Sequence, residues 1–444
     1  MKLTLLSLAL ATSLLLSSDA SSPSIAISQG AIAAVPLTLN PHYKRNTPAH
    51  IQKLNKRYPN IKVRAGGDGG NIVSSGTTGR VGLVNVKSDL EYYGTVKVGT
   101  PAQLLRLNFD TGSSDIWFPS TSCSTSACKS NHHSLFDPSK SSTYKKDGRH
   151  WKVEYGDGSV ASGQLAYELI NIGGVQVRQT IGLATNVSKQ FKNSPEDGVF
   201  GLGFSSLMSV KGVNTFMDNA INGTLKQPVV SILLPSSRRN GGRNGHILFG
   251  GIDHSRFTSQ LHYVPVTQKG YWQVKLDAFK VPVLISNKTN ANTAAAENKA
   301  RNPIEIPLQN QDAILDTGTT LIILSSTAAK KIHSSIPGST LHPKLGWLVP
   351  CSLRNRRPTS STSFSSNKKD AIAFKLNGKC FHVPLADLAF EAVQGLGKEG
   401  EWCLSGVQGG QEGLWILGDV FIKNHYAVFD YSPEKPRVGL APLK

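Results

Sequence analysis

The sequence predicts an all-β protein made of two similar halves, and three observations support this. From Val81 onward, short runs rich in Val, Ile, Leu, Tyr and Phe alternate with Gly, Asn, Ser and Pro, a pattern typical of strands separated by turns. Helical patterns are few and short, as at 215–222 and 326–334. Third, an apolar run that leads into Asp-Thr-Gly occurs twice. The 444 residues are enough for two hydrophobic cores.

The repeated motif is an Asp-Thr-Gly turn followed by a hydroxyl residue. Its copies lie at Asp110, Thr111, Gly112 and Ser113 and, 206 residues later, at Asp316, Thr317, Gly318 and Thr319. Glycine permits a tight turn, which presents each Asp at the mouth of a buried element where its pKa can be tuned. One such motif is most often a plain turn. Two copies with matching apolar flanks indicate a duplicated half-site.

Two further patterns accompany the repeat. A pair of apolar residues and a glycine occurs downstream of each turn, with Gly201 in 198–204 and Gly418 in 415–421. A glycine inside a strand marks close approach of another backbone, so both segments are expected to pass beside other strands. The stretch 155–159, Tyr-Gly-Asp-Gly-Ser, places Gly-Asp-Gly after an aromatic strand end and predicts a β-hairpin.

The N-terminal region has the pattern of targeting and processing segments. A short basic start followed by an apolar run predicts a signal peptide over 1–20, which is too short for a membrane span. Residues 21–80 are interpreted as a removable pro-segment with a dibasic site at Lys56-Arg57 and a Gly/Ser/Thr-rich end. With no membrane anchor in the sequence, we expect a secreted, extracellular protein and favour this over delivery to a vacuole.

Five cysteines suit an exported protein. Cys123 and Cys128 are close enough to staple a small loop, whereas Cys351, Cys380 and Cys403 leave one thiol over. Without a CxxC pair or a His/Cys cluster at zinc spacing, neither a metal nor another cofactor is expected. Three sequons predict glycosylation, at Asn186, Asn222 and Asn287.

The formal charge of +19 raises the question of a nucleic acid partner. The basic residues are scattered through loops, among them 236–245, 286–303 and 353–370, without aromatic interleaving. Together with export, this pattern argues against nucleic acid binding.

The two Asp-Thr-Gly copies, the hairpin and both glycine segments together resemble the pepsin-like aspartic proteases, most closely the secreted acid proteases of Mucorales-type fungi. The resemblance runs from about Val81 to Lys444. It implies a bilobal all-β fold with two β-barrel-like lobes, over 81–270 and 271–444, and an active-site cleft between them. It also implies a monomer that is made as a zymogen, cleaves extended peptides and is blocked by pepstatin-type inhibitors.

The resemblance also assigns roles to individual residues. Asp110 and Asp316 would be the catalytic pair, sharing a water and one proton, an arrangement for which aspartic proteases are the type example. Their support would come from Thr111, Gly112, Ser113, Thr317, Gly318 and Thr319. The hairpin becomes a flap over the substrate, carried by Tyr155, Gly156 and Asp157 with Trp117 close by. The family disulfides pair Cys123 with Cys128 and Cys351 with Cys403, so that Cys380 has no counterpart.

One departure from the mammalian pattern bears on specificity. Asp157 stands where mammalian members usually have a neutral residue, and it resembles fungal members that accept a basic side chain beside the scissile bond. We therefore expect cleavage after Lys as well as after large apolar residues.

Four alternatives are less well supported. A catalytically dead binding module would show a damaged Asp-Thr-Gly or flap tyrosine, and both are intact. A glycoside hydrolase has no reason to repeat Asp-Thr-Gly with matched flanks. A homodimeric protease needs only one copy in each chain. Serine and cysteine catalysis lack their nucleophile motifs.

Overall fold

The computed structural model describes residues 77–86, 89–130, 133–155, 158–238, 245–284, 302–355, 370–398, 400–410, 412–413, 415–432 and 434–444. The predicted signal peptide, almost all of the predicted pro-segment, and Gly156, Asp157 and Asn287 lie outside these ranges. Within them the chain is mainly β-strand, in three sheets, so the all-β prediction is confirmed.

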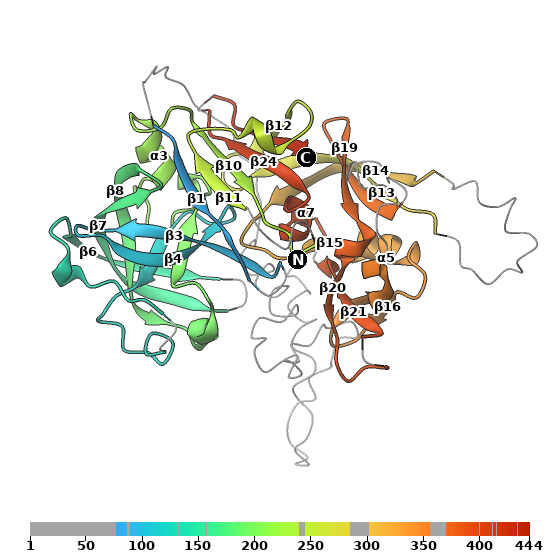
Figure 1. Cartoon of the computed structure of the whole chain (residues 1–444), viewed down its shortest axis with the longest axis horizontal. Helices are drawn as coiled ribbons and strands as arrows, with labels where there is room; N and C mark the ends of the chain where they lie inside the picture. Colours follow the sequence, from blue (N-terminus) through green and yellow to red (C-terminus); the bar gives the residue numbers. More distant parts are fainter. Residues whose placement is uncertain are drawn as a thin grey trace, which may run out of the picture.

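An eight-stranded sheet is built from the first half of the chain (Figure 1). In spatial order its strands are β2 (Val84–Val86), β3 (Glu91–Val98), β4 (Gln103–Asp110), β9 (Gly198–Gly201), β5 (Ile116–Pro119), β8 (Val175–Val187), β7 (Val160–Ile172) and β6 (Lys145–Glu154). The long hairpin β7–β8 turns at Gly173 and Gly174, whose φ angles of 55° and 104° suit glycine. Strand β4 of this sheet ends at Asp110, the first residue of the first Asp-Thr-Gly turn.

A thirteen-stranded sheet joins the two halves. Its path is β1 (Gly79–Gly82), β11 (His246–Phe249), β10 (Val229–Leu233), β24 (His425–Asp430), β25 (Arg437–Pro442), β12 (His262–Gln268), β13 (Gln273–Val281), β14 (Ile304–Leu315), β23 (Ile416–Leu417), β15 (Ile322–Ser325) and β22 (Val407–Gly410), with β18 (Ala371–Leu376) and β19 (Lys379–Pro384) branching from β13. Because β10 pairs with β24, strands from both predicted lobes share one sheet; Figure 1 shows them side by side between the halves.

The third sheet has four strands, in the order β16 (Thr340–His342), β17 (Gly346–Pro350), β21 (Trp402–Ser405) and β20 (Ala389–Ala392). The α-helices are short: α3 (Phe216–Ile221), α5 (Ser326–Ser334), α6 (Leu385–Leu388) and α7 (Asp419–Ile422). Single 3₁₀ turns lie at η1 (Pro138–Lys140), η2 (Lys189–Asn193), η3 (Ser205–Leu207), η5 (His254–Arg256) and η6 (Cys351–Asn355). Helices α3 and α5 confirm the two helical patterns predicted from the sequence. Among the described residues, no helix is both long and apolar enough to cross a bilayer.

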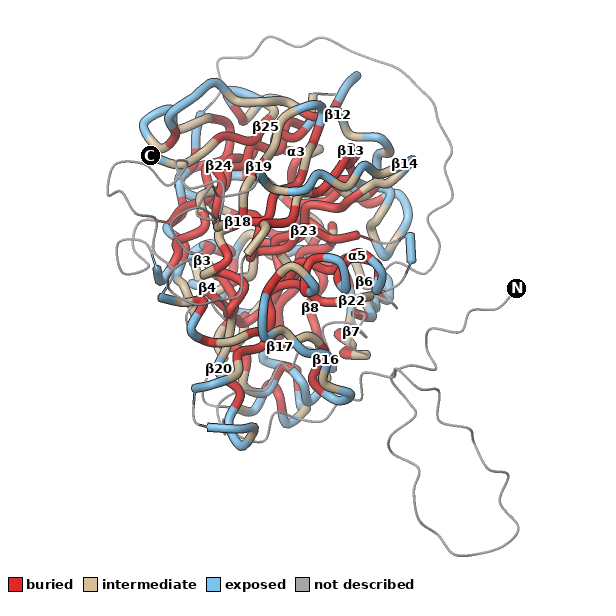
Figure 2. The backbone as a smooth tube through the Cα atoms, turned by 90° about the vertical axis from the view of Figure 1, so that its right-hand side faces the viewer, coloured by how far each residue is buried: buried red, intermediate tan, exposed pale blue. Residues whose placement is uncertain are grey.

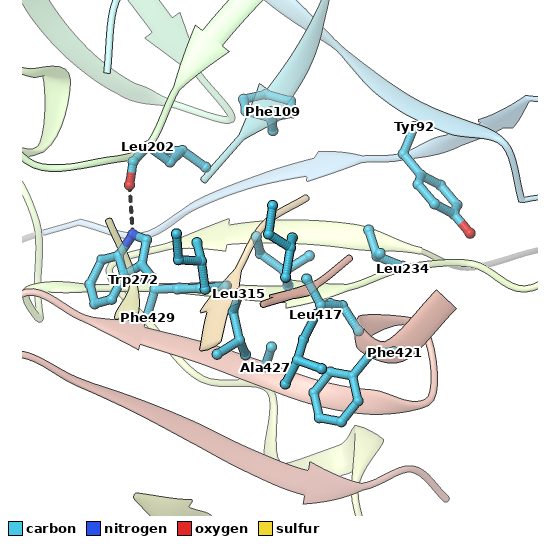
Figure 3. Packing of buried hydrophobic residues seen from close by; sticks show 14 of the residues in the cluster. Tyr92, Phe109, Leu202, Leu234, Trp272, Leu315, Leu417, Phe421, Ala427 and Phe429 are labelled. Atoms are coloured by element: carbon cyan, nitrogen blue, oxygen red, sulfur yellow. Dashed lines mark hydrogen bonds between the residues drawn. The ribbon is translucent and has the colours of Figure 1, made fainter. Parts of the chain in front are cut away.

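The main hydrophobic core runs through both halves, and the buried backbone passes through the middle of the molecule while exposed segments lie mostly at its edge (Figure 2). Trp272, which comes directly before β13 in the C-terminal half, is fully buried. Its Nε1 donates to the carbonyl of Leu202, which follows β9 (2.8 Å; Figure 3). The hydroxyl of Tyr431 donates to the same carbonyl (2.7 Å). Two aromatic residues from the C-terminal half therefore hold the backbone beside the first Asp-Thr-Gly turn.

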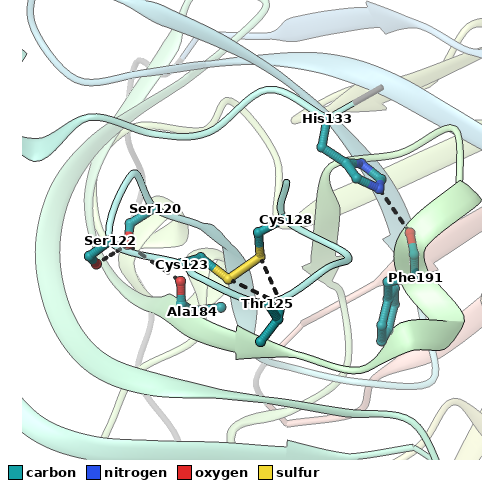
Figure 4. The surroundings of a disulfide bond; sticks show 8 residues. All are labelled: Ser120, Ser122, Cys123, Thr125, Cys128, His133, Ala184 and Phe191. Carbon is teal, nitrogen blue, oxygen red and sulfur yellow. Dashed lines mark hydrogen bonds between the residues drawn. A yellow bond between two sulfur atoms is a disulfide. The ribbon is translucent and has the colours of Figure 1, made fainter. Parts of the chain in front are cut away.

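Both predicted disulfides are present. Cys123–Cys128 closes a small loop in which Thr125 lies against both sulfur atoms (Figure 4). Cys351–Cys403 connects η6 to β21. Cys380 is a free thiol of intermediate burial.

Candidate active site

The first Asp-Thr-Gly turn lies where β4 ends. Asp110 is 3% exposed, and its Oδ1 accepts a hydrogen bond from the backbone N–H of Gly112 (2.9 Å). The hydroxyl of Ser113 donates to its Oδ2. Both oxygens of the carboxylate are therefore oriented by donors within its own turn.

The second turn repeats this geometry after β14. Asp316 is fully buried, its Oδ1 accepts from the N–H of Gly318 (2.9 Å), and its Oδ2 accepts from the hydroxyl of Thr319 (2.6 Å). Serine in one half and threonine in the other make the same contact, as the sequence repeat predicts.

The two turns are tied together by their threonines. The N–H of Thr111 donates to the hydroxyl oxygen of Thr317 (3.1 Å), and the N–H of Thr317 donates to the hydroxyl oxygen of Thr111 (3.0 Å). Each hydroxyl donates in turn to a carbonyl of the opposite strand, Thr111 to Leu315 (3.0 Å) and Thr317 to Phe109 (2.6 Å). This reciprocal network joins residues about two hundred positions apart and fixes the turns relative to each other.

The carboxylate of Asp110 lies directly against the second turn. A Cβ atom added to Gly318 would fall 2.1 Å from Asp110 Oδ1, far inside van der Waals contact. Glycine is therefore required at this position by close approach of the first carboxylate. The two Asp-Thr-Gly turns are therefore in direct contact in the structure.

The glycine segments pass beside the turns as predicted. β9 runs parallel to β4 and β23 runs parallel to β14, so each half places a strand next to its own turn. A Cβ on Gly201 would lie 2.4 Å from the backbone of Ser114, and one on Gly418 would lie 2.2 Å from the carbonyl oxygen of Thr319. Both glycines permit a backbone contact that a side chain would prevent.

Tyr155 stands at the start of the predicted flap and is 3% exposed. Its N–H donates to the carbonyl of Ser159 (2.8 Å), and its own carbonyl accepts from the N–H of Gly158 (2.9 Å). Gly156 and Asp157 lie outside the described ranges. The indole N–H of Trp117 donates to the Tyr155 hydroxyl, and the two ring centroids are 6.5 Å apart. The predicted pairing of Tyr155 with Trp117 is therefore present.

Two buried carboxyl groups near these elements were not singled out from the sequence. Asp419, at the start of α7, is completely buried; burial, and next the negative charge of Asp316, raise its pKa well above the usual range. Its Oδ1 has no hydrogen-bond partner among the described residues. Asp115 accepts from Ser209 and from the indole of Trp151, and burial raises its pKa. Asp419 directly follows Gly418, so the glycine repeat was the one sequence signal pointing toward it.

The remaining predicted sites lie on the surface or apart from the turns. Asn186 and Asn222 are exposed, on β8 and after α3. In the described ranges no group of three or more His, Cys, Asp or Glu side chains is placed to hold a metal ion.

An all-β chain whose two Asp-Thr-Gly turns are hydrogen-bonded to each other defines the pepsin-like class of aspartic protease. A family comparison agrees, because the eukaryotic aspartyl protease family matches residues 91–443. Rhizopuspepsin-1 of Rhizopus niveus is 38% identical, with 92% of each chain aligned, and rhizopuspepsin-3 of the same fungus is 35% identical over the whole of both chains. Cathepsin E of Rattus norvegicus is 34% identical over 80% of each chain. The chain belongs to the eukaryotic aspartyl protease family and is an aspartic endopeptidase of the pepsin type.

Proposed function

We propose that the protein is a secreted acid endopeptidase, made as a zymogen, in which Asp110 and Asp316 activate a water molecule between them. The observation that carries this proposal is the reciprocal hydrogen bonding of Thr111 and Thr317, which holds the two Asp-bearing turns together. Two carboxylates held this close cannot both ionise at low cost, so the pair retains one proton over an acid range of pH.

The reaction uses the pair as base and acid. The ionised carboxylate takes a proton from the water as its oxygen attacks the peptide carbonyl carbon, and the protonated carboxyl gives its proton to the carbonyl oxygen. The tetrahedral intermediate then collapses: the carboxyl that took the proton from water gives it to the amine nitrogen as the C–N bond breaks. The other carboxylate takes a proton from a hydroxyl of the intermediate, which leaves a carboxylic acid and restores the single proton of the pair. No covalent acyl-enzyme forms. Ser113, Thr319 and the N–H groups of Gly112 and Gly318 hold the carboxylate oxygens in position throughout.

A pH–rate profile on denatured globin, with and without pepstatin, tests this function. We expect activity below neutral pH, inhibition by pepstatin, and no effect of chelators. Asp316→Asn removes an ionisable group at nearly constant shape, so it is expected to abolish turnover while leaving the thermal unfolding midpoint close to that of the parent. Activity retained by the Asp316→Asn protein contradicts the assignment.

The substrate is an extended peptide that the flap covers, with large apolar residues or Lys beside the scissile bond. Closure of the flap carried by Tyr155 excludes water and clamps the peptide. Asp157 supplies a negative charge for the Lys side chain. The test is the ratio of cleavage after Lys to cleavage after Phe, which Asp157→Thr is expected to lower severalfold; an unchanged ratio removes this part of the proposal.

Activation requires removal of the leader upstream of Thr77. The N–H of Thr77 donates to the carbonyl of Thr224 (2.8 Å), and β1, which starts at Gly79, pairs with β11. The first strand of the large sheet thus begins close to the predicted end of the pro-segment at residue 80. N-terminal sequencing of the acid-activated protein is expected to place its first residue at or before position 77.

Export and a monomeric state complete the proposal. The predicted signal peptide, the two disulfides and the exposed sequons at Asn186 and Asn222 are consistent with an extracellular glycoprotein. One chain contributes both Asp-Thr-Gly turns, so a second copy is not needed for a complete site. Pepstatin-type inhibitors are expected to occupy the same site as the substrate.

A further inference from the structure

A charged cavity lies between the first and second halves of the chain, and none of its lining residues belongs to the Asp-Thr-Gly turns. Its volume is about 210 Å³, many times what a single water requires. Its walls are mostly charged, with contributions from Asp89, Arg238, Arg354, Asp387, Phe390 and Lys423. Three cations and two carboxylates therefore line one space, and the carboxylate of Glu391 acts on Arg354 from outside the lining.

Lys423 and Asp89 satisfy each other. They are each 2% exposed, and Lys423 Nζ donates to Asp89 Oδ2 (2.9 Å). The other oxygen of Asp89 accepts from the N–H of Ser237 (2.6 Å) and from the Asn85 amide (2.5 Å). Although burial opposes ionisation, Lys423 and these donors together hold the pKa of Asp89 below its usual range. The pair is therefore formed without a ligand, and Lys423 Nζ also lies 3.5 Å from Asp387 Oδ1.

The two arginines, Arg238 and Arg354, have guanidinium N–H groups left without a hydrogen-bond acceptor among the described residues. Arg238 forms an ion pair with Asp387, with Nε 3.2 Å from Oδ1, and donates through Nη2 to the carbonyl of Ala389 (3.1 Å). Arg354 donates through Nε to the same carbonyl (3.0 Å) and through Nη2 to the carbonyl of Phe390 (2.6 Å). Among the described residues neither Nη1 has an acceptor. Burial, and next the positive charge of Arg238, lower the pKa of Arg354, whereas the negative charge of Glu391 raises it.

Asp387, in contrast, lacks a hydrogen-bond donor for one of its carboxylate oxygens within the described part of the chain. Its side chain is 3% exposed, and its Oδ2 is buried with no hydrogen-bond donor among the described residues. A buried carboxylate oxygen without a donor is costly. The cavity therefore offers guanidinium N–H groups to an acceptor and a carboxylate oxygen to a donor.

We propose that this cavity binds a tetrahedral oxyanion that carries its own hydroxyl group, of which phosphate is the simplest. Its ionised oxygens accept from Arg238 and Arg354, the geometry for which guanidinium groups are suited. Its P–OH donates to Asp387 Oδ2. Bound in this way, the ion connects Arg238, after β10, to Arg354, in η6, and so stabilises the contact between the two halves.

Isothermal titration of the full chain with inorganic phosphate tests the site, at pH 6.5 and at ionic strength held constant with NaCl. We expect saturable binding of one phosphate per chain. Because a charge-assisted hydrogen bond is lost, Arg354→Gln and Arg238→Gln are each expected to weaken the affinity about tenfold or more. The control is Arg149→Gln, which removes an exposed arginine paired with Asp147 and is expected to leave the affinity unchanged.

Sulfate provides the sharper comparison because at this pH it has no proton to donate to Asp387. Wild-type protein is expected to bind phosphate at least about tenfold more tightly than sulfate, and Asp387→Asn, whose amide can donate instead, is expected to lose that preference. O-phosphoserine shows whether the natural ligand is the free ion or a phosphorylated side chain. If it binds as tightly as phosphate, the cavity accepts a phosphoryl group attached to a side chain; if it binds more weakly, the ligand is the free ion.

Three results overturn the proposal: no saturable phosphate binding, equal affinity for phosphate and sulfate in the wild type, or unchanged affinity in both arginine variants. If Arg354→Gln fails to fold because the carbonyl of Phe390 loses this donor, the Arg238→Gln variant decides the matter, since the Arg238 side chain is 27% exposed. The readout is binding, so its outcome is independent of whether the chain cleaves peptides.

Discussion

Replacing the buried His333 with glutamine is expected to flatten the acid dependence of the protein's stability. His333 lies in α5, is 1% exposed and stacks on Trp347 with ring centroids 4.3 Å apart. Its Nδ1 lies 2.6 Å from the carbonyl oxygen of Ala329, so Nδ1 carries the proton. Its Nε2 then accepts from the hydroxyl of Ser405 (2.8 Å). The neutral ring is fully hydrogen-bonded, and a second proton has no place in this arrangement.

The magnitude follows from the pKa of His333. Burial lowers that pKa to about 4 from 6.5. As pH falls through 6.5, the unfolded chain takes up a proton that the folded protein refuses until pH reaches about 4, so folding stability is lost within this window and changes little below it. The difference corresponds to about 3 kcal/mol at 1.36 kcal/mol per pH unit.

Urea unfolding at pH 7 and pH 4 measures this effect, in an Asp316→Asn background that prevents self-digestion. The parent is expected to lose about 3 kcal/mol more between the two pH values than the His333→Gln variant does. Comparing the changes with pH cancels whatever packing the substitution costs at both values. His150→Gln, which removes an exposed histidine on β6, serves as the control and is expected to behave as the parent. Equal losses in the parent and His333→Gln refute the assignment.

Two other predictions test contacts between distant parts of the chain. Gly318→Ala places a Cβ against the carboxylate of Asp110, which must move; we expect peptidase activity to fall roughly 100-fold, while Gly82→Ala, where the space is open, retains activity in the same assay. Lys423→Met leaves Asp89 buried without its cation and is expected to lower the free energy of unfolding at pH 6 by about 3–5 kcal/mol. A denaturation midpoint unchanged by Lys423→Met shows that this buried pair does not stabilise the fold.

Features encoded within a few residues were predictable from the sequence. The period of apolar residues and the turn residues around them identified strands such as β3 and β11 and the helices α3 and α5. The repeated Asp-Thr-Gly predicted two equivalent turns, and the structure shows the same carboxylate hydrogen bonds in each. Strand period, turn chemistry and glycine placement are local consequences of steric constraint, so a linear pattern carries them.

Contacts between distant segments were not predictable in this way. The pairing of β10 with β24, the complete burial of Asp419 and the ion pair of Lys423 with Asp89, 334 residues apart, depend on which surfaces pack together. A lysine or an aspartate has the same local pattern whether it faces water or a partner. Segments distant in the sequence determine how far such a side chain is buried and which charged groups lie next to it. Burial and these charges in turn determine its pKa and its contribution to stability.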